Sequence, residues 1–421
     1  MQTSKQVLTT YYGLTLMTTL AASFIWGINT LFLLDAGLTN TEAFAANAFF
    51  TAGMVLFEIP TGVVADTSGR RISFLIGSVT LLLSTLAYWL MWHQQAPFYA
   101  WALASMFLGF GFTFFSGAVE AWLVDALDAT HFQGSLDTVF SRNQMVSGIA
   151  MLIGSISGGL IAQFSNLGVP YVIRALMLIF SFVFAFIYMK DLGFSPVKDK
   201  TAMEEVRFIL AASIEHGWRQ PTVQKLMLSA PFTAGVFVYA FYAMQPYLLE
   251  LYGNSEAYAV AGLAAAIVAG SQMIGSMMVP RLLKRFKRRT SIILLCLCLS
   301  AIMMFLIGLA NSFYIAIALF MAWAIILSAM MPVRQALLNR LIPSEQRATV
   351  LSFDSLMSSS GGVVSQPLLG RSADVWSYGM SYLICATVQL IAIPITLLAR
   401  RTCSDADKTT PERSNATGKA R

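Results

Sequence analysis

The chain has 421 residues, of which 57% are hydrophobic and only 11% are charged, and its formal net charge is +6. A soluble globular protein carries about 25% charged residues, so this chain has too few to cover a water-facing surface of its size. The composition excludes a soluble enzyme, a disordered chain and a fibrous protein, and it predicts an integral membrane protein. The excess of Lys and Arg is typical of loops that orient a membrane protein, so no nucleic-acid partner is expected.

Apolar runs long enough to cross a bilayer, roughly 20 residues, recur along the whole chain. The first set comprises 10–34, 43–65, 72–92, 97–124, 139–164 and 170–190. The second set comprises 226–250, 257–281, 291–310, 312–333, 348–371 and 379–399. The sequence therefore predicts an all-α integral membrane protein with twelve transmembrane helices in two six-helix halves.

Polar stretches between and after these runs divide the chain. We expect an N-terminal six-helix half at 1–190, a cytoplasmic linker at 191–222, a C-terminal six-helix half at 223–400 and a disordered cytoplasmic tail at 401–421. Within the linker, apolar residues from Val206 to Ile214 recur at helical spacing among charges. This pattern predicts a short amphipathic helix that lies on the membrane surface.

The distribution of Lys and Arg predicts the orientation of the chain. Basic residues gather in the loops after spans 2, 4, 8 and 10 and in the linker, while the other loops hold almost none. Arg174 and Arg371 are interpreted as lying at the edges of those other loops. Because basic loops stay in the cytoplasm, both termini are expected there, in a multi-pass protein of a cell membrane. Short loops favour a bacterial inner membrane.

The second half repeats three patterns of the first half in the same order. They are Asn40-Thr-Glu-Ala with Asn254-Ser-Glu-Ala, Arg70-Arg71 with Arg288-Arg289, and Gly159-x-x-Ala-x5-Gly168 with Gly370-x-x-Ala-x5-Gly379. The offsets of 214, 218 and 211 residues are those of a duplicated six-helix unit. In transporters built this way, the substrate binds between the halves near the middle of the membrane.

The loop between spans 2 and 3 reads Gly62-Val-Val-Ala-Asp66-Thr-Ser-Gly69-Arg70-Arg71. Glycines permit a tight turn, and an Asp beside two Arg residues forms a compact charge cluster. The pattern Gly-x-x-x-Asp-x-x-Gly-Arg-Arg at this place resembles the signature of the major facilitator superfamily. The resemblance implies that these residues form a conformational latch, in which Asp66 binds neighbouring helix ends while the transporter faces outward.

Span 5 contains Ala150-x-x-x-Gly154-Ser155-x-x-Gly158-Gly159. This resembles the antiporter motif of the same family, Gly-x-x-x-Gly-Pro-x-x-Gly-Gly, with Ala and Ser in two of its places. Small residues four apart let two helices approach closely, so Gly154, Gly158 and Gly159 are expected to pack at the seam between the halves. The motif favours export, although ordinary helix packing explains the same residues.

Charged residues inside the spans are candidates for function, because a charge in the bilayer costs several kcal/mol. The candidates for proton coupling or for a charge network are Glu58, Glu120, Asp125, Arg142, Arg334 and Asp354. Glu120 lies deepest in span 4, so we expect it to titrate. For Glu58, Asp125 and Asp354 the favoured interpretation is a set of ion pairs at the cytoplasmic rim that opens and closes during transport.

Spans 1, 4, 7 and 10 line the substrate cavity in the family that the chain resembles. The candidates on these spans are Trp26, Asn29, Tyr239, Tyr242, Gln245 and Trp323. Aromatic residues at helical spacing are also typical of packing, so both interpretations stay open. An aromatic, thioether-rich cavity suits an amphipathic organic molecule, and no basic residue lies at mid-span in these four helices, which disfavours strongly anionic substrates.

These patterns predict a secondary active transporter and not an enzyme. We expect it to export a small hydrophobic or amphipathic organic compound by alternating access, in exchange for protons. Uptake of a metabolite, proton-coupled or facilitated, and lipid flipping in the same fold stay open as alternatives. No cofactor or metal is expected, since the proton gradient supplies the energy and the four Cys residues lack metal-ligand spacing. The expected partners are the small-molecule substrate and the lipid bilayer, and the expected state is a monomer.

Overall fold

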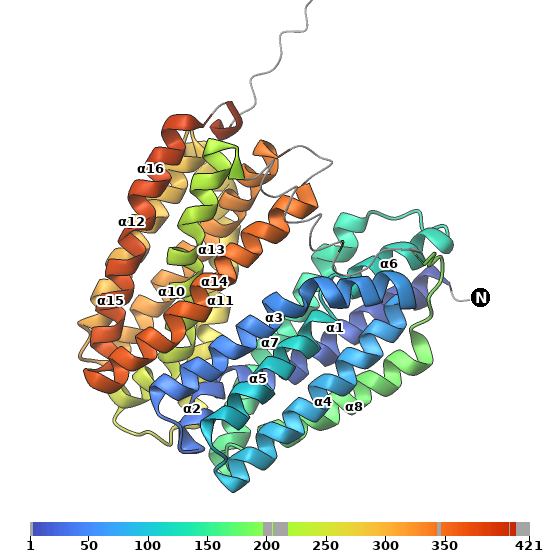
Figure 1. Ribbon diagram of the computed structural model, residues 1–421, viewed down its shortest axis with the longest axis horizontal. Helices are drawn as coiled ribbons and strands as arrows, with labels where there is room; N and C mark the ends of the chain where they lie inside the picture. The colour runs from blue at the N-terminus through green and yellow to red at the C-terminus, as the bar shows by residue number, and fades with distance from the viewer. Residues whose placement is uncertain (1–2, 197–203, 205–217, 343–346, 404, 410–421) are drawn as a thin grey trace, which may run out of the picture.

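The computed structural model describes residues 3–196, 204, 218–342, 347–403 and 405–409, which fold into two helical bundles (Figure 1). The N-terminal half contains α1 (Ser4–Trp26), α2 (Asn29–Asp35), α3 (Asn40–Ser68), α4 (Arg70–Gln94), α5 (Phe98–Thr113), α6 (Ala118–Ala129), α7 (Leu136–Phe164) and α8 (Val169–Tyr188). The C-terminal half contains α10 (Pro221–Tyr252), α11 (Tyr258–Arg285), α12 (Arg289–Gly308), α13 (Phe313–Leu341), α14 (Arg347–Val375), α15 (Tyr378–Leu390) and α16 (Ala392–Thr402).

Two of the predicted spans are broken helices. The first span bends by 48° between α1 and α2, where Gly27 and Ile28 interrupt the regular hydrogen bonding. The fourth span is divided into α5 and α6, and Gly117 at the break has a φ of +69°. A positive φ is accessible to Gly at little cost, so the glycine explains why the chain can turn at this place.

Membrane-crossing segments account for almost all of the described residues. Among these residues, ten helices are long and apolar enough to cross a bilayer, and the bent pair α1–α2 brings the number to eleven. The remaining predicted span, 348–371, is the 29-residue helix α14. It is less apolar than the others because it carries many Ser residues and packs between α10 and α3 instead of facing lipid alone.

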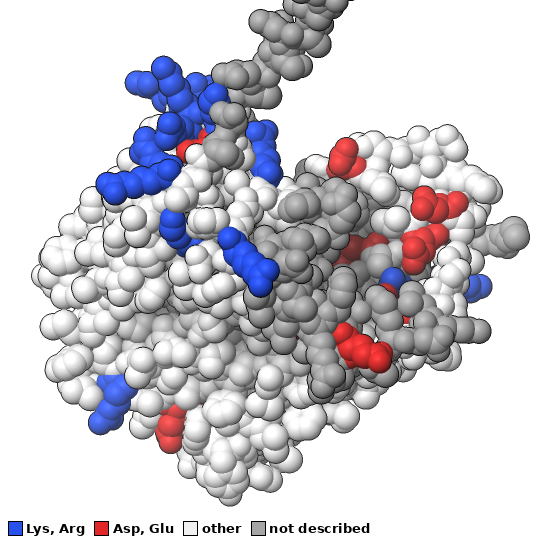
Figure 2. Space-filling view, turned by 45° about the horizontal axis from the view of Figure 1, so that its top comes forward, with Lys and Arg blue, Asp and Glu red and all other residues white. Residues whose placement is uncertain are grey.

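The two halves meet at one end of the molecule and diverge at the other (Figure 1). We call the end that contains the α2–α3 and α14–α15 connections the closed end, and the end that contains both chain termini the open end. Between the halves, α3 packs against α14 and α7 packs against α11. Figure 2 shows Lys and Arg gathered over the open end of the C-terminal half, where α11, α12 and α16 begin or end.

The tail packs in part against the C-terminal half. Asp407 accepts hydrogen bonds from the backbone nitrogen and the hydroxyl of Thr290, both at 2.7 Å. A carboxylate satisfies the free N–H groups at a helix start, which is why this polar segment docks on α12. The prediction of disorder from residue 401 is therefore wrong for 401–402, which end α16, and for 405–409. Residues 404 and 410–421 lie outside the described residues. The amphipathic helix predicted in the linker also lies outside them.

Candidate functional site

A carboxylate of the C-terminal half binds the N-terminal half at the closed end. The two oxygens of Asp374, near the end of α14, accept hydrogen bonds from the backbone nitrogens of Asn40 at 3.0 Å and Thr41 at 2.8 Å. The Thr41 hydroxyl donates a third bond at 2.5 Å, and the Tyr378 hydroxyl donates to the Asn40 side chain. Since Asn40 begins α3, a negative charge sits at a positive helix end, which stabilises the contact.

The pair α7–α11 forms a second, neutral contact at the closed end. Here Gln163 accepts a hydrogen bond from the backbone nitrogen of Ala259 at 3.3 Å. A Cβ atom at Gly159 would lie only 2.7 Å from the carbonyl oxygen of Tyr258 and 2.9 Å from the Cα of Gly262. The helices can therefore approach this closely only because both positions are glycine.

Gln245 of α10 links the halves at the break in the first span. Its amide nitrogen donates to the carbonyl oxygen of Trp26 at 2.9 Å, and its amide oxygen accepts from the backbone nitrogen of Thr30 at 3.0 Å. The Thr30 hydroxyl also donates to the carbonyl oxygen of Tyr242 at 3.0 Å. These bonds satisfy backbone groups that the break at Gly27 leaves without helical partners.

Of the five predicted cavity residues other than Gln245, three come together and two do not. Trp26, Asn29 and Tyr242 line one small cavity of about 70 Å³ beside the break in the first span. Tyr239 and Trp323 lie instead in the core of the C-terminal half, both 0% exposed. Periodicity alone could not separate the two groups, because all five residues lie on spans expected to line the cavity.

A larger cavity of about 810 Å³ lies between the halves toward the open end. Its walls come from α7 of one half and from α10, α11 and α13 of the other. The methionines that line it are Met145, Met151, Met273, Met277, Met330 and Met331. Flexible, polarisable thioethers adapt to apolar ligands of differing shape, so this surface fits an organic molecule better than a small ion.

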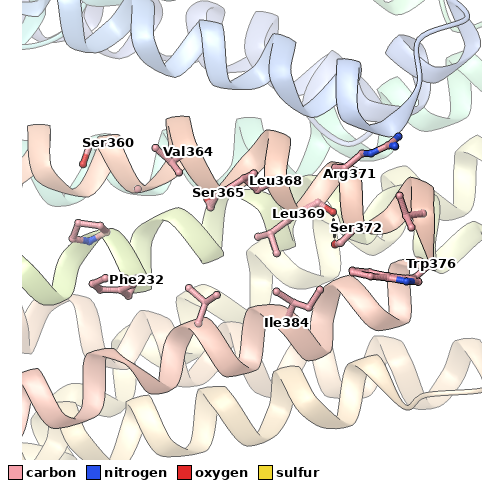
Figure 3. Close-up of a pocket in the computed structure, with 14 residues that line it drawn as sticks. Phe232, Ser360, Val364, Ser365, Leu368, Leu369, Arg371, Ser372, Trp376 and Ile384 are labelled. Atoms are coloured by element: carbon pink, nitrogen blue, oxygen red, sulfur yellow. Dashed lines mark hydrogen bonds between the residues drawn. The ribbon is translucent and has the colours of Figure 1, made fainter.

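A third hollow, of about 550 Å³, is a groove within the C-terminal half, between α10, α14 and α15 (Figure 3). Its walls are mainly apolar, including Phe232, Val364, Leu368 and Trp376. Figure 3 shows Arg371 extending away from these side chains toward the neighbouring half. Leu368 and Trp376 are more than half exposed, as expected for side chains that contact lipid.

The residues of the predicted latch form one charge cluster at the open end of the N-terminal half. Arg70 forms an ion pair with Asp66, and its Nε lies 3.9 Å from a carboxylate oxygen of Asp125. Gly69 makes the turn with a φ of +109°. The backbone nitrogen of Arg71 donates to Asp191 at 2.9 Å. None of these contacts involves a residue of the C-terminal half.

Gly62, the first residue of the predicted latch, has no described neighbour where a side chain would project. A Cβ atom placed there would meet no described atom within 4 Å. Nearer the closed end, α3 and α14 are in contact, since a Cβ at Gly370 would lie 2.9 Å from the carbonyl oxygen of Asn40. The two helices therefore touch at one end and separate at the other. An unlatched arrangement has this geometry, and the latch role itself stays a prediction.

The predicted acids of the N-terminal half differ in their surroundings. Glu58 of α3 accepts a hydrogen bond at 2.7 Å from the hydroxyl of Ser116, which lies in the break between α5 and α6. Glu120, expected to be deeply buried, is exposed in the first turn of α6. The position of Glu120 along the span therefore did not predict its burial, because the rotation of α6 decides which side chains are covered. Arg142 is exposed as well.

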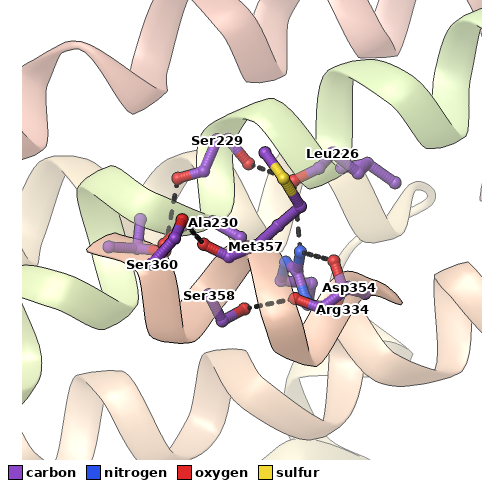
Figure 4. Close-up of polar contacts among 9 residues, drawn as sticks. Leu226, Ser229, Ala230, Arg334, Asp354, Met357, Ser358 and Ser360 are labelled. Carbon is purple, nitrogen blue, oxygen red and sulfur yellow. Dashed lines mark hydrogen bonds and ion pairs between the residues drawn. The ribbon is translucent and has the colours of Figure 1, made fainter. Parts of the chain in front are cut away.

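Arg334 and Asp354 form a two-point ion pair in the C-terminal half (Figure 4). The two guanidinium nitrogens lie 2.6 and 2.7 Å from the two carboxylate oxygens. One of these nitrogens also donates to the carbonyl oxygen of Leu226 at 3.1 Å. Each side chain is only 11% exposed, so the pair joins α10, α13 and α14 with little competition from solvent.

The small residues of span 5 serve two contacts. Gly154 and Gly158 face α1 of the same half, since Cβ atoms there would overlap with Ser23 and with the carbonyl oxygen of Phe24. Gly159 faces α11 of the other half. The motif therefore packs two helices against α7, and the seam between the halves involves its last glycine.

Arg174 is a residue whose position the sequence did not reveal. It was expected at the edge of a loop, but it is 2% exposed inside the N-terminal half. Its Nε donates to the Thr85 hydroxyl at 3.0 Å, and it lines the small cavity together with Asn47. An isolated Arg near the start of an apolar run was the available signal, and a charge buried among spans is functional by default.

Two bundles of membrane-spanning helices with a cavity between them are typical of a membrane transporter, and the relatives of this chain are transporters and not enzymes. The family model for the Major Facilitator Superfamily matches residues 11–289 and 257–420. The chain belongs to the major facilitator superfamily. An uncharacterized transporter of this type, YxaM of Bacillus subtilis (strain 168), is 21% identical over 407 residues, which is 92% of this chain and 94% of the relative.

Solved structures of transporters share the fold. The nucleoside transporter NupG superposes with a TM-score of 0.74 at 11% identity, over 95% of this chain and 100% of that chain. A bacterial homologue of the human lysosomal transporter Spinster, in an inward-facing and unoccupied conformation, gives 0.73 at 16% identity, over 97% and 99%. A POT family transporter in complex with 5-aminolevulinic acid gives 0.70 at 14% identity, over 96% and 100%.

Proposed function

We propose that this transporter exports a small amphipathic organic compound by alternating access, in exchange for protons. The observation that carries the proposal is the methionine-lined cavity of about 810 Å³ between the two halves. It lies toward the open end, while Asp374 and Gln245 hold the halves together at the closed end. A substrate could enter from the open end and leave after the halves rock about the cavity.

The charge distribution indicates which side of the membrane the cavity faces. Basic side chains at the open end include Lys284, Arg285, Lys287, Arg288 and Arg401 (Figure 2). Because basic residues are retained in the cytoplasm, the open end is the cytoplasmic end in this proposal. A cavity that opens to the cytoplasm can take up a compound directly from it.

Glu120 is the favoured residue for exchange of the proton. It forms no ion pair and no hydrogen bond with a described residue, whereas Asp354 is bound at two points by Arg334. Protonation of Asp354 would leave the Arg334 charge without its partner at a cost of several kcal/mol. Glu120 can gain or lose a proton without breaking such a pair.

Inverted membrane vesicles test the exchange directly. Respiration acidifies their interior, and a fluorescent weak base that accumulates there is quenched. A transported compound from an amphipathic panel should release protons and restore the fluorescence. Glu120→Gln should abolish this recovery, and Asp66→Asn should slow it by impairing the latch. Glu256→Gln is the matched control, because Glu256 is an exposed acid in a loop at the closed end.

Each result decides a part of the proposal. Recovery with one compound, lost in Glu120→Gln and kept in Glu256→Gln, supports proton exchange through Glu120. Equal recovery in both variants places the exchange at another residue. No recovery with any compound contradicts proton-driven export, and proton-coupled or facilitated uptake of a metabolite would then be measured in intact cells.

The lateral groove of the C-terminal half favours a second candidate, a lipid flippase (Figure 3). Its exposed apolar wall, with Leu368 and Trp376, could admit an acyl chain from the side. Fluorescent lipid in proteoliposomes distinguishes the two functions. If Leu368→Ser and Trp376→Ser reduce lipid exchange, the flippase is favoured. If both variants leave lipid exchange unchanged and a compound still restores the fluorescence of inverted vesicles, the exporter is favoured.

A further inference from the structure

A guanidinium group lies deep inside the N-terminal half without a carboxylate partner. Arg174 is 2% exposed, and no described Asp or Glu forms an ion pair with it. Burial of an uncompensated charge is costly. The guanidinium interacts electrostatically here with the side chains of Tyr88, Tyr171 and Tyr242. Hydroxyl dipoles compensate a full charge only in part, so the site is incomplete as it stands.

The hydrogen bonds of Arg174 leave donor capacity unused. Its Nε donates to the Thr85 hydroxyl at 3.0 Å and its Nη1 lies 3.5 Å from the carbonyl oxygen of Ala21. Its Nη2 donates to no described residue, although a guanidinium has five N–H donors. The two bonds hold the group in place, and the group lines the cavity of about 70 Å³.

A second unused donor lies in the same cavity. The Tyr171 hydroxyl donates to the Asn29 side-chain oxygen at 3.1 Å, and the Asn29 side-chain nitrogen donates to the Asn47 oxygen at 3.0 Å. This chain of hydrogen bonds fixes the orientation of Asn47, whose side-chain nitrogen is buried and has no hydrogen-bond partner among the described residues. Asn47 is only 5% exposed and lines the cavity beside Arg174. Buried donors without partners are rare, and one that shares a cavity with the unused Nη2 of Arg174 points to an acceptor that binds there.

The cavity is formed by both halves of the transporter. Tyr242 of α10 lines it opposite the N-terminal residues and lies near enough to Arg174 to interact electrostatically. The apolar walls of the cavity are formed by Ile25, Trp26, Phe50, Leu108 and Phe112. The guanidinium carbon of Arg174 lies 5.8 Å from the centre of the Phe112 ring. A polar group bound here would therefore be surrounded by apolar surface at the junction of the halves.

We propose that Arg174 and Asn47 bind the carboxylate of a monoanionic, amphipathic substrate. One guanidinium matches the charge and the two oxygens of one carboxylate, whereas a phosphate dianion would leave a buried charge unpaired. The cavity has room for the carboxylate, and the apolar body of the substrate would lie against Trp26 and Tyr242 between the halves. The proposal deepens the proposed export function and rests on it. It also revises the expectation that strongly anionic substrates are disfavoured, for the case of a single negative charge.

Direct binding measurements test the site without transport. Radiolabelled octanoate is bound to the purified full-length protein in nanodiscs, and octanol and octylamine, which have the same alkyl chain, are used as competitors. Octanoate should compete at least about tenfold better than octanol, and octylamine should compete least. Arg174→Gln should weaken octanoate binding at least about tenfold and remove the preference over octanol. Arg281→Gln, which alters an exposed Arg on α11 outside the three cavities, should leave both unchanged.

A second variant covers the case in which Arg174→Gln does not fold. Asn47→Asp places a carboxylate in the cavity that the guanidinium lines, so it should weaken octanoate binding while octanol binding persists. Equal binding of octanoate and octanol to the native protein would overturn the proposal, and so would an unchanged octanoate affinity in a folded Arg174→Gln or Asn47→Asp protein. Failure of the export function has a different signature: octanoate binds through Arg174, but no compound releases protons from inverted vesicles.

Discussion

Asp374 and Gln163 occupy equivalent places in the two halves, and each binds the start of a helix in the opposite half. Both are the last residue but one of a 29-residue helix, α14 and α7 respectively. Asp374 accepts from the backbone nitrogen of Thr41, the second residue of α3, and Gln163 accepts from that of Ala259, the second residue of α11. Two related contacts thus hold the halves together at the closed end. The hydrogen bond to Asp374 is charged and measures 2.8 Å, and the hydrogen bond to Gln163 is neutral and measures 3.3 Å.

Asp374→Asn should weaken the closed end. The substitution removes the negative charge at the start of α3, and charge-assisted hydrogen bonds of this partly exposed kind contribute roughly 1–2 kcal/mol. The population open at this end should rise about tenfold. Thr51 of α3 lies under the contact and faces Gln366 of α14, so a Thr51→Cys protein should react faster with an impermeant maleimide added from outside.

The control for this experiment is Asp35→Asn. Asp35 is an acid at the same end, but it accepts a hydrogen bond from Trp92 within its own half. Labelling of Thr51→Cys should not change in this variant. If Asp374→Asn and Asp35→Asn labelled at the same rate as the parent protein, the contact at the start of α3 would not control opening.

Gln163→Glu should strengthen the weaker of the two contacts. A carboxylate at this place would carry a negative charge to the start of α11, as Asp374 does at α3. The labelling rate of Thr51→Cys should fall, and transport should slow because the closed end opens less often. Gln163→Ala supplies the comparison, since it removes the 3.3 Å bond to Ala259 and should increase labelling slightly. A faster rate in Gln163→Glu would contradict the equivalence of the two contacts.

Gln245→Leu should loosen the break in the first span. The substitution leaves the backbone nitrogen of Thr30 and the carbonyl oxygen of Trp26 without their partners, at about 1–3 kcal/mol for each buried group. Hydrogen exchange at the Thr30 peptide should accelerate by at least about tenfold. Gln389→Leu is matched in chemistry but breaks a bond to Ser300 within the C-terminal half, so it should leave exchange at Thr30 unchanged.

Arg334 and Asp354 should behave as one unit in thermal unfolding. Removal of either partner from a buried pair costs roughly 3–5 kcal/mol, because the other charge is left uncompensated. Arg334→Gln and Asp354→Asn should each destabilise the purified protein strongly, and the double variant should be less unstable than the sum of the two. Additive losses would show that the two side chains act independently in spite of their 2.6 Å contact.

The sequence predicted the architecture well because spans depend on composition and length. Eleven of the predicted spans meet the criteria of length and apolar character within the described residues, and α14 completes the bundle. The repeated patterns correctly indicated two related halves. Breaks at Gly27 and Gly117 were not predicted, because a glycine inside an apolar run is compatible with both a continuous and a broken helix.

The binding surfaces were harder to predict because they depend on how helices are rotated and which partners they meet. Arg174 is buried since α8 turns it toward Thr85 and Ala21, and nothing in its own segment specifies those neighbours. Tyr239 and Tyr242 lie three residues apart on α10, yet the first enters the core and the second lines the cavity. The sequence shows that both are aromatic, but the rotation of α10 decides their roles.

The most direct test of alternating access measures both ends of the molecule at once. Spin labels at Gln94→Cys and Asn311→Cys report the distance across the closed end, and labels at Asp128→Cys and Lys284→Cys report the open end, in a background without native cysteines; all four sites are exposed. Introducing Asp374→Asn should lengthen the first distance and shorten the second. Distances that stay unchanged, or that change in the same direction at both ends, would contradict the account.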